Sequence, residues 1–299
     1  MAYISFQPHD HFDCPRWTGS SSTTTIGMQF KPDALWIKRY DGNGHPLLNN
    51  SSEGTGQNWI PSGNNANNTT VHVASYTSDG FTLTGNINDT NAASQNYLAA
   101  CWKINAGTES TNTSGSISAE VHILYYTDTE TDLIQFAGTG GNQDDVGGWN
   151  DTKPTSSVWS IGNKSHHNTS GAASIAYCFT QINGFSKFGL YKGNGNANGS
   201  YIYCGFRPKW LMVKKWDDTE DWFVKSPVVT GYGIGGTLTR TLKFSDNTSS
   251  TNCTVDITAT GFRPTTTDGK ANGDGNVYLY MAFADHPIVG SNGTIALAI

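Results

Sequence analysis

Charged side chains are scarce in this sequence. Asp, Glu, Lys and Arg account for 14% of its 299 residues, compared with about a quarter in typical soluble domains. The formal net charge is −6, and the Lys and Arg residues form no basic cluster. Because a nucleic-acid backbone requires a basic protein face, we expect no nucleic-acid partner.

Long apolar runs are also missing. No run approaches the roughly 20 apolar residues of a membrane-spanning helix. The opening residues 1–12 lack the basic start and apolar core of a secretory signal peptide. We therefore expect a protein that is made in the cytoplasm and does not insert into a membrane.

Familiar catalytic motifs are absent too. The sequence contains no GxSxG, HExxH or CxxC, and no GK[ST] follows the glycine-rich residues 231–236. The carboxylates that could pair for glycoside hydrolysis all fall in expected loops: Asp144, Asp145, Asp151, Asp217, Asp218, Glu220 and Asp221. We expect no enzymatic activity and no cofactor.

Two stretches contain residue types that bind metal ions. The three aspartates of residues 144–151 could supply oxygen ligands to calcium, but their spacing differs from that of the DxDxDG loop. His9, His11 and Asp13 alternate and could share one strand face, but no further ligand set follows them. A polar loop and a polar arm are the simpler interpretations, and we expect no bound metal.

The cysteines show no zinc-site spacing. They are Cys14, Cys101, Cys178, Cys204 and Cys253. Cys101 and Cys178 match in the internal repeat described below, where a third copy has Ala282. A position that accepts Cys or Ala is typical of a small core site, so we predict buried thiols rather than disulfides.

Gly, Asn, Ser and Thr supply most of the polarity. The chain contains 34 Gly, and these residue types disfavour helices and favour tight turns. Hydrophobic residues make up 36% of the chain and aromatic residues 12%, which is enough for a core. Short apolar runs bounded by Gly, Asn and Pro are typical of strands and hairpins, so we predict an all-β fold.

The clearest of these runs, residues 185–215, has a counterpart in residues 13–39. WTG at 17–19 matches YKG at 191–193, FKP at 30–32 matches FRP at 206–208, and WIK at 36–38 matches MVK at 212–214. Such long-range self-similarity indicates duplication. We predict internally duplicated modules of β-sandwich or jelly-roll-like architecture.

The repeat also defines the expected domain organisation. Two full copies flank a shorter middle copy. The expected segments are an N-terminal arm (1–12), a first β-module (13–104), a linker (105–116), a truncated middle β-module (117–184), a third β-module (185–287) and a C-terminal strand or tail (288–299).

The tryptophans divide into two groups. Those within predicted strands are expected in the core: Trp17, Trp36, Trp102, Trp159 and Trp210. Those in predicted loops are candidates for stacking on a glycan, because loop aromatics often carry function: Trp59, Trp149, Trp216 and Trp222. The alternative is that these four anchor their loops against a sheet.

Together these pieces resemble a group of repeat-containing structural proteins of tailed bacteriophages, chiefly those that infect marine bacteria. The resemblance rests on LYKGNG at 190–195, GFRP at 205–208, WIK at 36–38, DGF at 79–81, WNDT at 149–152, YCF at 177–179 and YMAFADHP at 280–287. The sequence departs from the pattern with DCPRW at 13–17, where a hairpin strand is usual. The resemblance implies a virion structural or tail-fibre-like protein and transfers no catalytic or ligand-binding residue.

We therefore expect a protein on the surface of a tailed phage virion, assembled in the host cytoplasm with other virion proteins. The first hypothesis is a short fibre- or spike-like adhesin that contacts a host-surface glycan. The alternative is a capsid decoration (cement) protein, held by the N-terminal arm and the C-terminal strand. A free glycan-binding module or hydrolase is the third. Homotrimers are common in the first two roles, so we expect a homo-oligomer.

Overall fold

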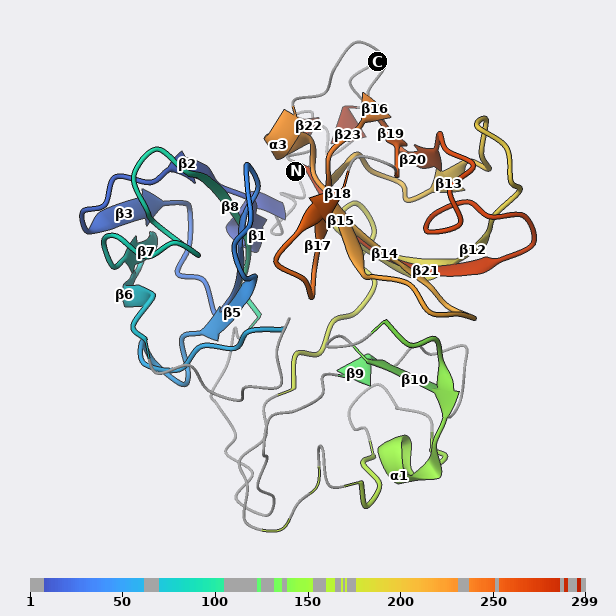
Figure 1. Ribbon diagram of the computed structural model, residues 1–299, viewed down its shortest axis with the longest axis horizontal. Coiled ribbons are helices and arrows are strands. Elements are labelled where there is room, and N and C mark those ends of the chain that lie inside the picture. Colours follow the sequence, from blue (N-terminus) through green and yellow to red (C-terminus); the bar gives the residue numbers. More distant parts are fainter. Residues whose placement is uncertain are drawn as a thin grey trace, which may run out of the picture.

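The computed structural model describes residues 8–61, 70–104, 123–124, 132–135, 139–152, 160–164, 168, 170, 176–230, 237–250, 253–285, 288–289 and 295–296. Within them the chain forms antiparallel sheets arranged as two sandwiches, with a smaller sheet below them in the view of Figure 1. No helix in this part of the chain has the length and apolar character needed to cross a bilayer. The predicted all-β fold is confirmed.

The first sandwich is formed by the first third of the chain. After a short 3-10 turn, η1 (Pro8–Asp10), its strands are β1 (Phe12–Asp13), β2 (Arg16–Thr18), β3 (Thr24–Gly27), β4 (Ala34–Arg39), β5 (Leu47–Asn50), β6 (Val73–Thr77), β7 (Gly80–Leu83) and β8 (Asn96–Trp102). The larger sheet has the order β2–β8–β4–β5, with β1 also paired to β8, and the smaller sheet has the order β3–β7–β6.

The second sandwich repeats this topology. Its elements are β12 (Ser186–Lys192), β13 (Ile202–Tyr203), β14 (Pro208–Lys215), β15 (Phe223–Lys225), α3 (Pro227–Thr230), β16 (Thr237–Leu238), β17 (Thr241–Lys243), β18 (Ser249–Ser250), β19 (Val255–Thr258), β20 (Gly261–Pro264) and β21 (Val277–Ala284). The larger sheet runs β12–β21–β14–β15–β17–β18 and the smaller sheet β13–β20–β19–β16. The path β12–β21–β14–β15 corresponds to β2–β8–β4–β5 of the first sandwich, and the path β13–β20–β19 corresponds to β3–β7–β6. This correspondence confirms the predicted duplication.

The remaining elements are short. β9 (Ile123–Leu124), β10 (Asp132–Gln135) and β11 (Gln143–Asp144) form the small sheet before α1 (Val146–Trp149), and β22 (Ile288–Val289) pairs with β23 (Ile295–Ala296). The expected linker, 105–116, lies outside the described residues. In the expected middle copy, residues 176–180 are described and carry no strand.

An aromatic pair marks the same place in both sandwiches. Trp17 stacks on Tyr97 with ring centroids 5.7 Å apart and meets Phe81 edge-on. In the second sandwich Tyr191 stacks on Tyr278 at 5.0 Å. Offset stacks of this kind add specificity to the burial of large rings. The match between WTG and YKG in the sequence therefore reflects the same aromatic stack at equivalent positions of the two sandwiches.

The two larger sheets pack against each other, so the sheets form four successive layers. Along β8, alternate residues from Tyr97 to Cys101 belong to the core inside the first sandwich. The residues between them, from Leu98 to Trp102, belong to a core shared with the second sandwich. β14 and β21 alternate in the same way. All three strands are buried on both faces. The sequences of β8 and β21 are accordingly almost continuously apolar, whereas β14 also contains three buried lysines.

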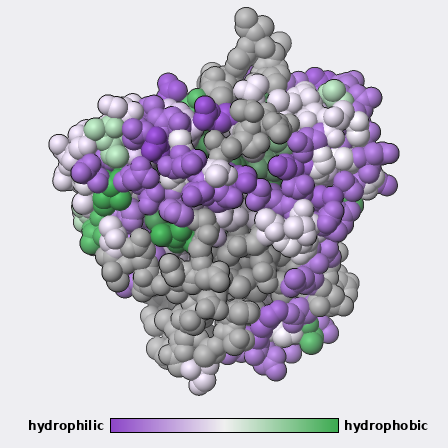
Figure 2. All heavy atoms as spheres, viewed as in Figure 1, coloured by the Kyte–Doolittle hydropathy of each residue, from purple (hydrophilic) through white to green (hydrophobic). Residues whose placement is uncertain are grey.

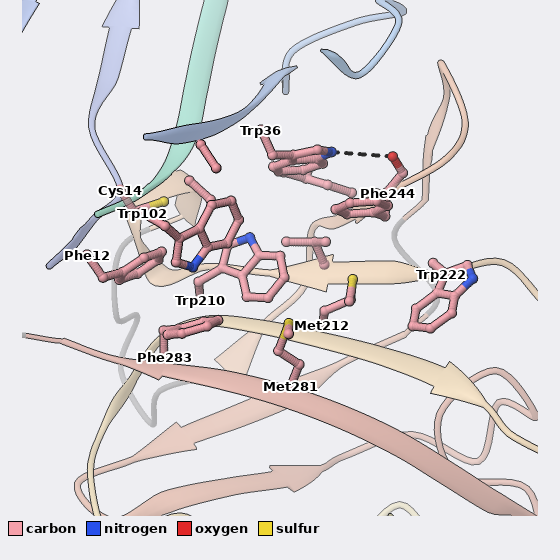
Figure 3. Close-up of a cluster of buried hydrophobic side chains, with 14 of the residues drawn as sticks. Phe12, Cys14, Trp36, Trp102, Trp210, Met212, Trp222, Phe244, Met281 and Phe283 are labelled. Carbon is pink, nitrogen blue, oxygen red and sulfur yellow. Dashed lines mark hydrogen bonds between the residues drawn. The ribbon is translucent and has the colours of Figure 1, made fainter. Parts of the chain in front are cut away.

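Large aromatic side chains fill this shared core (Figure 3). Trp36 of the first sandwich stacks on Phe244 of the second with ring centroids 5.4 Å apart, and its indole Nε1 donates to the Phe244 carbonyl oxygen at 3.3 Å. Phe12 stacks on Phe283 at 5.0 Å. Contacts between these distant parts of the chain join the two sandwiches into one body.

The sequence DCPRW splits the first strand but leaves its register unchanged. Phe12 of β1 pairs with Trp102, and Arg16 of β2 pairs with Leu98, as in one unbroken antiparallel strand. Pro15 separates the two because it has no N–H to donate. Phe12, which the repeat assigned to the N-terminal arm, is thus part of the first sheet and of the shared core.

Among the described residues, three lysines are fully buried: Lys38, Lys214 and Lys225. Lys38 and Lys214 occupy equivalent positions of β4 and β14. Each donates to a carbonyl oxygen of the turn that follows, to Gly44 at 2.7 Å and to Asp218 at 3.0 Å. Burial lowers the pKa of all three to about 8, because a low-polarity surrounding disfavours the charged form.

Candidate functional site

Two of the four tryptophans expected to stack on a glycan are buried. Trp216 has an exposed fraction of 7% and Trp222 of 1%, and both belong to the shared core. A buried ring offers no face to a ligand, so the prediction for Trp216 and Trp222 is wrong. These residues stand at the two ends of the acidic turn between β14 and β15, where the chain re-enters the sheet.

The other two candidates lie on separate elements. Trp59 is half-buried and its backbone pairs with Leu48 of β5 through hydrogen bonds of 2.7 and 2.8 Å. Trp149 is half-buried at the end of α1. The core tryptophans Trp17, Trp36, Trp102 and Trp210 are buried as predicted, and Trp159 lies outside the described residues.

The most exposed aromatic side chains among the described residues belong to β13 and the residue before it. Tyr201 has an exposed fraction of 49% and Tyr203 of 64%. Between them Ile202 points into the core of the second sandwich, paired with Phe262 of β20. Because successive side chains of a strand point to opposite faces, the two tyrosines and Arg263 lie on the outer face of the smaller sheet.

Both tyrosines lie beside a glycine. The Tyr201 hydroxyl forms a 2.5 Å hydrogen bond with Thr260 Oγ1. A Cβ added to Gly261 would lie 3.1 Å from that hydroxyl oxygen, and one added to Gly205 would lie 3.8 Å from the Tyr203 ring. Both ends of the Tyr201 side chain therefore touch the sheet, and its ring is held along the surface.

Polar side chains border the two rings. Arg263 donates to Asp256 Oδ2 and to Asn198 Oδ1, each at 2.8 Å. The Asn198 loop is itself fixed by the buried Asn272, whose side chain donates to the Asn196 carbonyl oxygen at 2.7 Å. We call this surface the tyrosine face; its residues are Asn198, Tyr201, Tyr203, Asp256, Thr260 and Arg263.

Two of the carboxylates considered for glycoside hydrolysis, Asp145 and Asp221, have structural partners. Asp145 caps α1 by accepting a 3.0 Å hydrogen bond from the Gly147 amide, and it pairs with Lys164, which lowers its pKa. Asp221 pairs with Lys243 at 2.9 Å. Carboxylates that cap a helix or pair with a lysine in this way suit structural roles better than proton transfer.

The candidate metal ligands near the N-terminus likewise contact other residues. His9 Nε2 lies 3.2 Å from Asp10 Oδ1, whereas Asp13 accepts a 2.8 Å bond from Lys209. The His11 ring packs edge-on against Phe185 at 6.4 Å. Across the part of the chain that is described, no three His, Cys, Asp or Glu residues converge on a common point.

Four of the cysteines are buried free thiols, as predicted: Cys14, Cys101, Cys204 and Cys253. Cys101 pairs across the sheet with Leu35 and Ala282 with Leu211, so these two small residues do share one position of the repeat. Cys178 is exposed, so its prediction as a core residue is wrong. Its segment carries no strand that would direct the side chain inward.

This difference predicts selective thiol chemistry. At pH 8 we expect one of the five thiols of the native protein to react within minutes with a disulfide reagent, and all five after denaturation. Burial raises the pKa of Cys14, Cys204 and Cys253 to about 12, and only the thiolate attacks. Colorimetric titration of native and denatured protein measures both counts. A Cys178→Ser variant that still showed a fast thiol would contradict the assignment.

Comparison with known proteins gives one match. The chain matches a protein family described as a domain of unknown function (DUF7483), at residues 7–147 and again at residues 122–287. The first match contains the first sandwich and the second match contains the second, and both include residues 122–147. Comparisons with curated proteins and with solved structures returned no match. The chain therefore belongs to the DUF7483 family and carries its domain twice.

Proposed function

We propose that this chain is a structural protein on the surface of a tailed phage virion, made in the host cytoplasm and serving as a short fibre- or spike-like adhesin. The motif resemblance supports the virion setting. The shared core supports a rigid structural body. The observation that carries the host-contact role is the tyrosine face, which places two exposed rings on the outer face of the smaller sheet of the second sandwich. In the view of Figure 2, most of the described surface residues are hydrophilic.

The proposal is of a binding protein rather than an enzyme. Asp145 and Asp221 serve as ion-pair partners of lysines, and Asp145 also as a helix cap. The tyrosine face offers aromatic rings and hydrogen-bonding groups on an open sheet. Such a surface suits recognition of an extended ligand, whereas catalysis requires groups aimed at one reacting atom.

Capsid decoration is the alternative. It would use the N-terminal arm and the C-terminal strand as clamps on neighbouring subunits. Phe12 is instead buried in the chain's own shared core, and β22 pairs with β23 of the same chain. These internal contacts favour the adhesin over decoration.

Immunogold labelling of purified phage particles tests the proposal. We expect gold at the tail or its tip, from an antibody raised against the whole chain. Gold over the head would favour decoration and overturn the adhesin role. Particles without gold, alongside a positive control for the tail, would remove both virion roles.

We also propose that the chain forms a homo-oligomer. Light scattering of the purified chain would measure its oligomeric state.

A further inference from the structure

We propose that the tyrosine face binds a neutral carbohydrate chain, with Tyr201 and Tyr203 as the stacking platforms. The inference deepens the proposed adhesin function by naming the chemistry of its receptor, and it rests on that function for its biological setting. It also moves the glycan site from the loop tryptophans to the outer face of the β13–β20–β19–β16 sheet.

The composition of the face matches the chemistry of a sugar. A pyranose ring has apolar C–H faces, which pack on the faces of aromatic rings, and a rim of hydroxyls, which need hydrogen-bond partners. Tyr201 and Tyr203 supply rings that are 49% and 64% exposed. Asn198 and Arg263 supply planar amide and guanidinium groups beside them, and the buried Asp256 carboxylate holds the guanidinium in place.

The face is ordered before any ligand arrives. The Tyr201 hydroxyl is held by Thr260, and the Arg263 guanidinium is held by hydrogen bonds to both Asn198 and Asp256. Side chains that are already fixed lose little conformational entropy when a ligand binds. A weakly hydrophobic ligand such as a sugar can therefore be bound with useful affinity.

Charge favours a neutral ligand. The Asp256 carboxylate lies 2.8 Å from Arg263 and matches its positive charge. The paired charges cancel, so Arg263 offers no unmatched positive charge to an anion. The formal charge of the whole chain is −6, which further disfavours approach of a sulfated or uronic-acid polymer.

The spacing of the rings favours an extended ligand. Residues two apart on a strand are separated by about 6.6 Å along it, so Tyr201 and Tyr203 form two successive platforms. We expect the bound segment to contain at least two sugar units.

The first sandwich provides a comparison within the same molecule. Ile26 of β3 pairs with Phe81 as Ile202 pairs with Phe262, so the counterparts of Tyr201 and Tyr203 are Thr25 and Gly27. By the same register, Thr82 and Ser75 stand where Arg263 and Asp256 stand. The scaffold thus folds with small neutral residues at these positions. The rings and the charged pair are additions confined to one copy and are not needed for the sheet.

A glycan array tests the inference with the full chain. The probes are neutral gluco-, galacto- and manno-oligosaccharides, together with sulfated and uronic-acid oligosaccharides of similar length. We expect binding to a neutral oligosaccharide and little binding to the acidic set. The double variant Tyr201→Thr, Tyr203→Ala should lose about tenfold in affinity for each ring removed, as measured by calorimetry with the oligosaccharide that binds best.

The first sandwich also supplies the matched control. Thr25→Ala with Thr82→Ala removes a 3.1 Å contact between hydroxyls on the equivalent outer face and should leave binding unchanged. Melting curves of both double variants verify folding. The inference is overturned if no neutral oligosaccharide binds, if only acidic ones bind, or if the tyrosine variant binds as well as the control. It is also overturned if the tyrosine variant dissociates an oligomer, because the face would then be a subunit contact.

These outcomes are independent of the particle labelling. Gold at the tail together with an array that shows no binding would retain the adhesin function and point to a different receptor. Tyrosine-dependent sugar binding together with unlabelled particles would retain the carbohydrate site and remove the virion role.

Discussion

Trp210→Ala is expected to lower the free energy of unfolding by about 3–5 kcal/mol, the cost typical of deleting a large buried ring. Trp210 is 1% exposed. It belongs to the second sandwich, but its ring meets Trp102 edge-on at 5.6 Å and Trp36 at 6.5 Å, both in the first. The cavity would therefore open between the two sandwiches and weaken both.

Chemical denaturation followed by tryptophan fluorescence and far-UV circular dichroism measures this loss. We expect wild type and variant each to unfold in a single transition, because the shared core couples the sandwiches. Tyr203→Ala, at an exposed position, is the control and should stay within about 0.5 kcal/mol of wild type. Two separate transitions in the wild type, or a loss below about 1 kcal/mol in Trp210→Ala, would contradict the shared core.

Lys225→Met is expected to cost about 3 kcal/mol or more. The Lys225 ammonium donates to the carbonyl oxygens of Leu238 and Arg240 at 3.1 Å, of Thr239 at 3.4 Å, and to Thr241 Oγ1 at 2.6 Å. Methionine has a similar length but no donor. Each buried acceptor left without its donor costs about 1–3 kcal/mol. Because the four acceptors share one ammonium group, we expect the total cost to be less than the sum of four such terms.

The cost of Lys225→Met should also increase with pH. Burial lowers the pKa of Lys225 from 10.5 to about 8, so above pH 8 the unfolded chain binds more protons at this residue than the folded chain. Stability from this group therefore rises with pH between about 8 and 10.5, by at most about 1.4 kcal/mol for each pH unit. The variant lacks this rise.

Urea denaturation of wild type and Lys225→Met at pH 7, 8 and 9 tests both points. The difference between the two proteins isolates Lys225, because their cysteines and tyrosines are the same. Lys192→Met, the same substitution at an exposed lysine of β12, should change little at any pH. A difference that shrinks as pH rises, or a loss no larger than that of the control, would refute the account of Lys225.

Much of the fold was predictable from local pattern. The alternation and turn residues around β12, β13 and β14 predicted strands, and the matches between WTG and YKG and between WIK and MVK predicted the duplication. The shared core left a signal as well. YLAACW in β8 and VYLYMAFA in β21 lack the polar alternation of a half-exposed strand, which indicates burial on both faces.

The candidate site was less predictable. Trp216 and Trp222 flank a polar, acidic turn, and local polarity indicated an exposed loop. Their burial depends on the packing of the first sandwich against the larger sheet of the second. Tyr201 and Tyr203 looked like ordinary strand residues, and Thr25 and Gly27 could be recognised as their counterparts only from the register of β3 with β7 and of β13 with β20.

Strand propensity, turn chemistry and repetition act over a few residues, so the amino-acid sequence was sufficient to predict the all-β class, the duplication and the small core position shared by Cys101 and Ala282. The tertiary structure alone decided that the larger sheets pack together, that Phe12 joins their core, and which aromatic rings stay exposed. Those outcomes depend on which surfaces meet across more than a hundred residues of chain. A strand's own sequence specifies its two faces, but its burial is set by what packs against each of them.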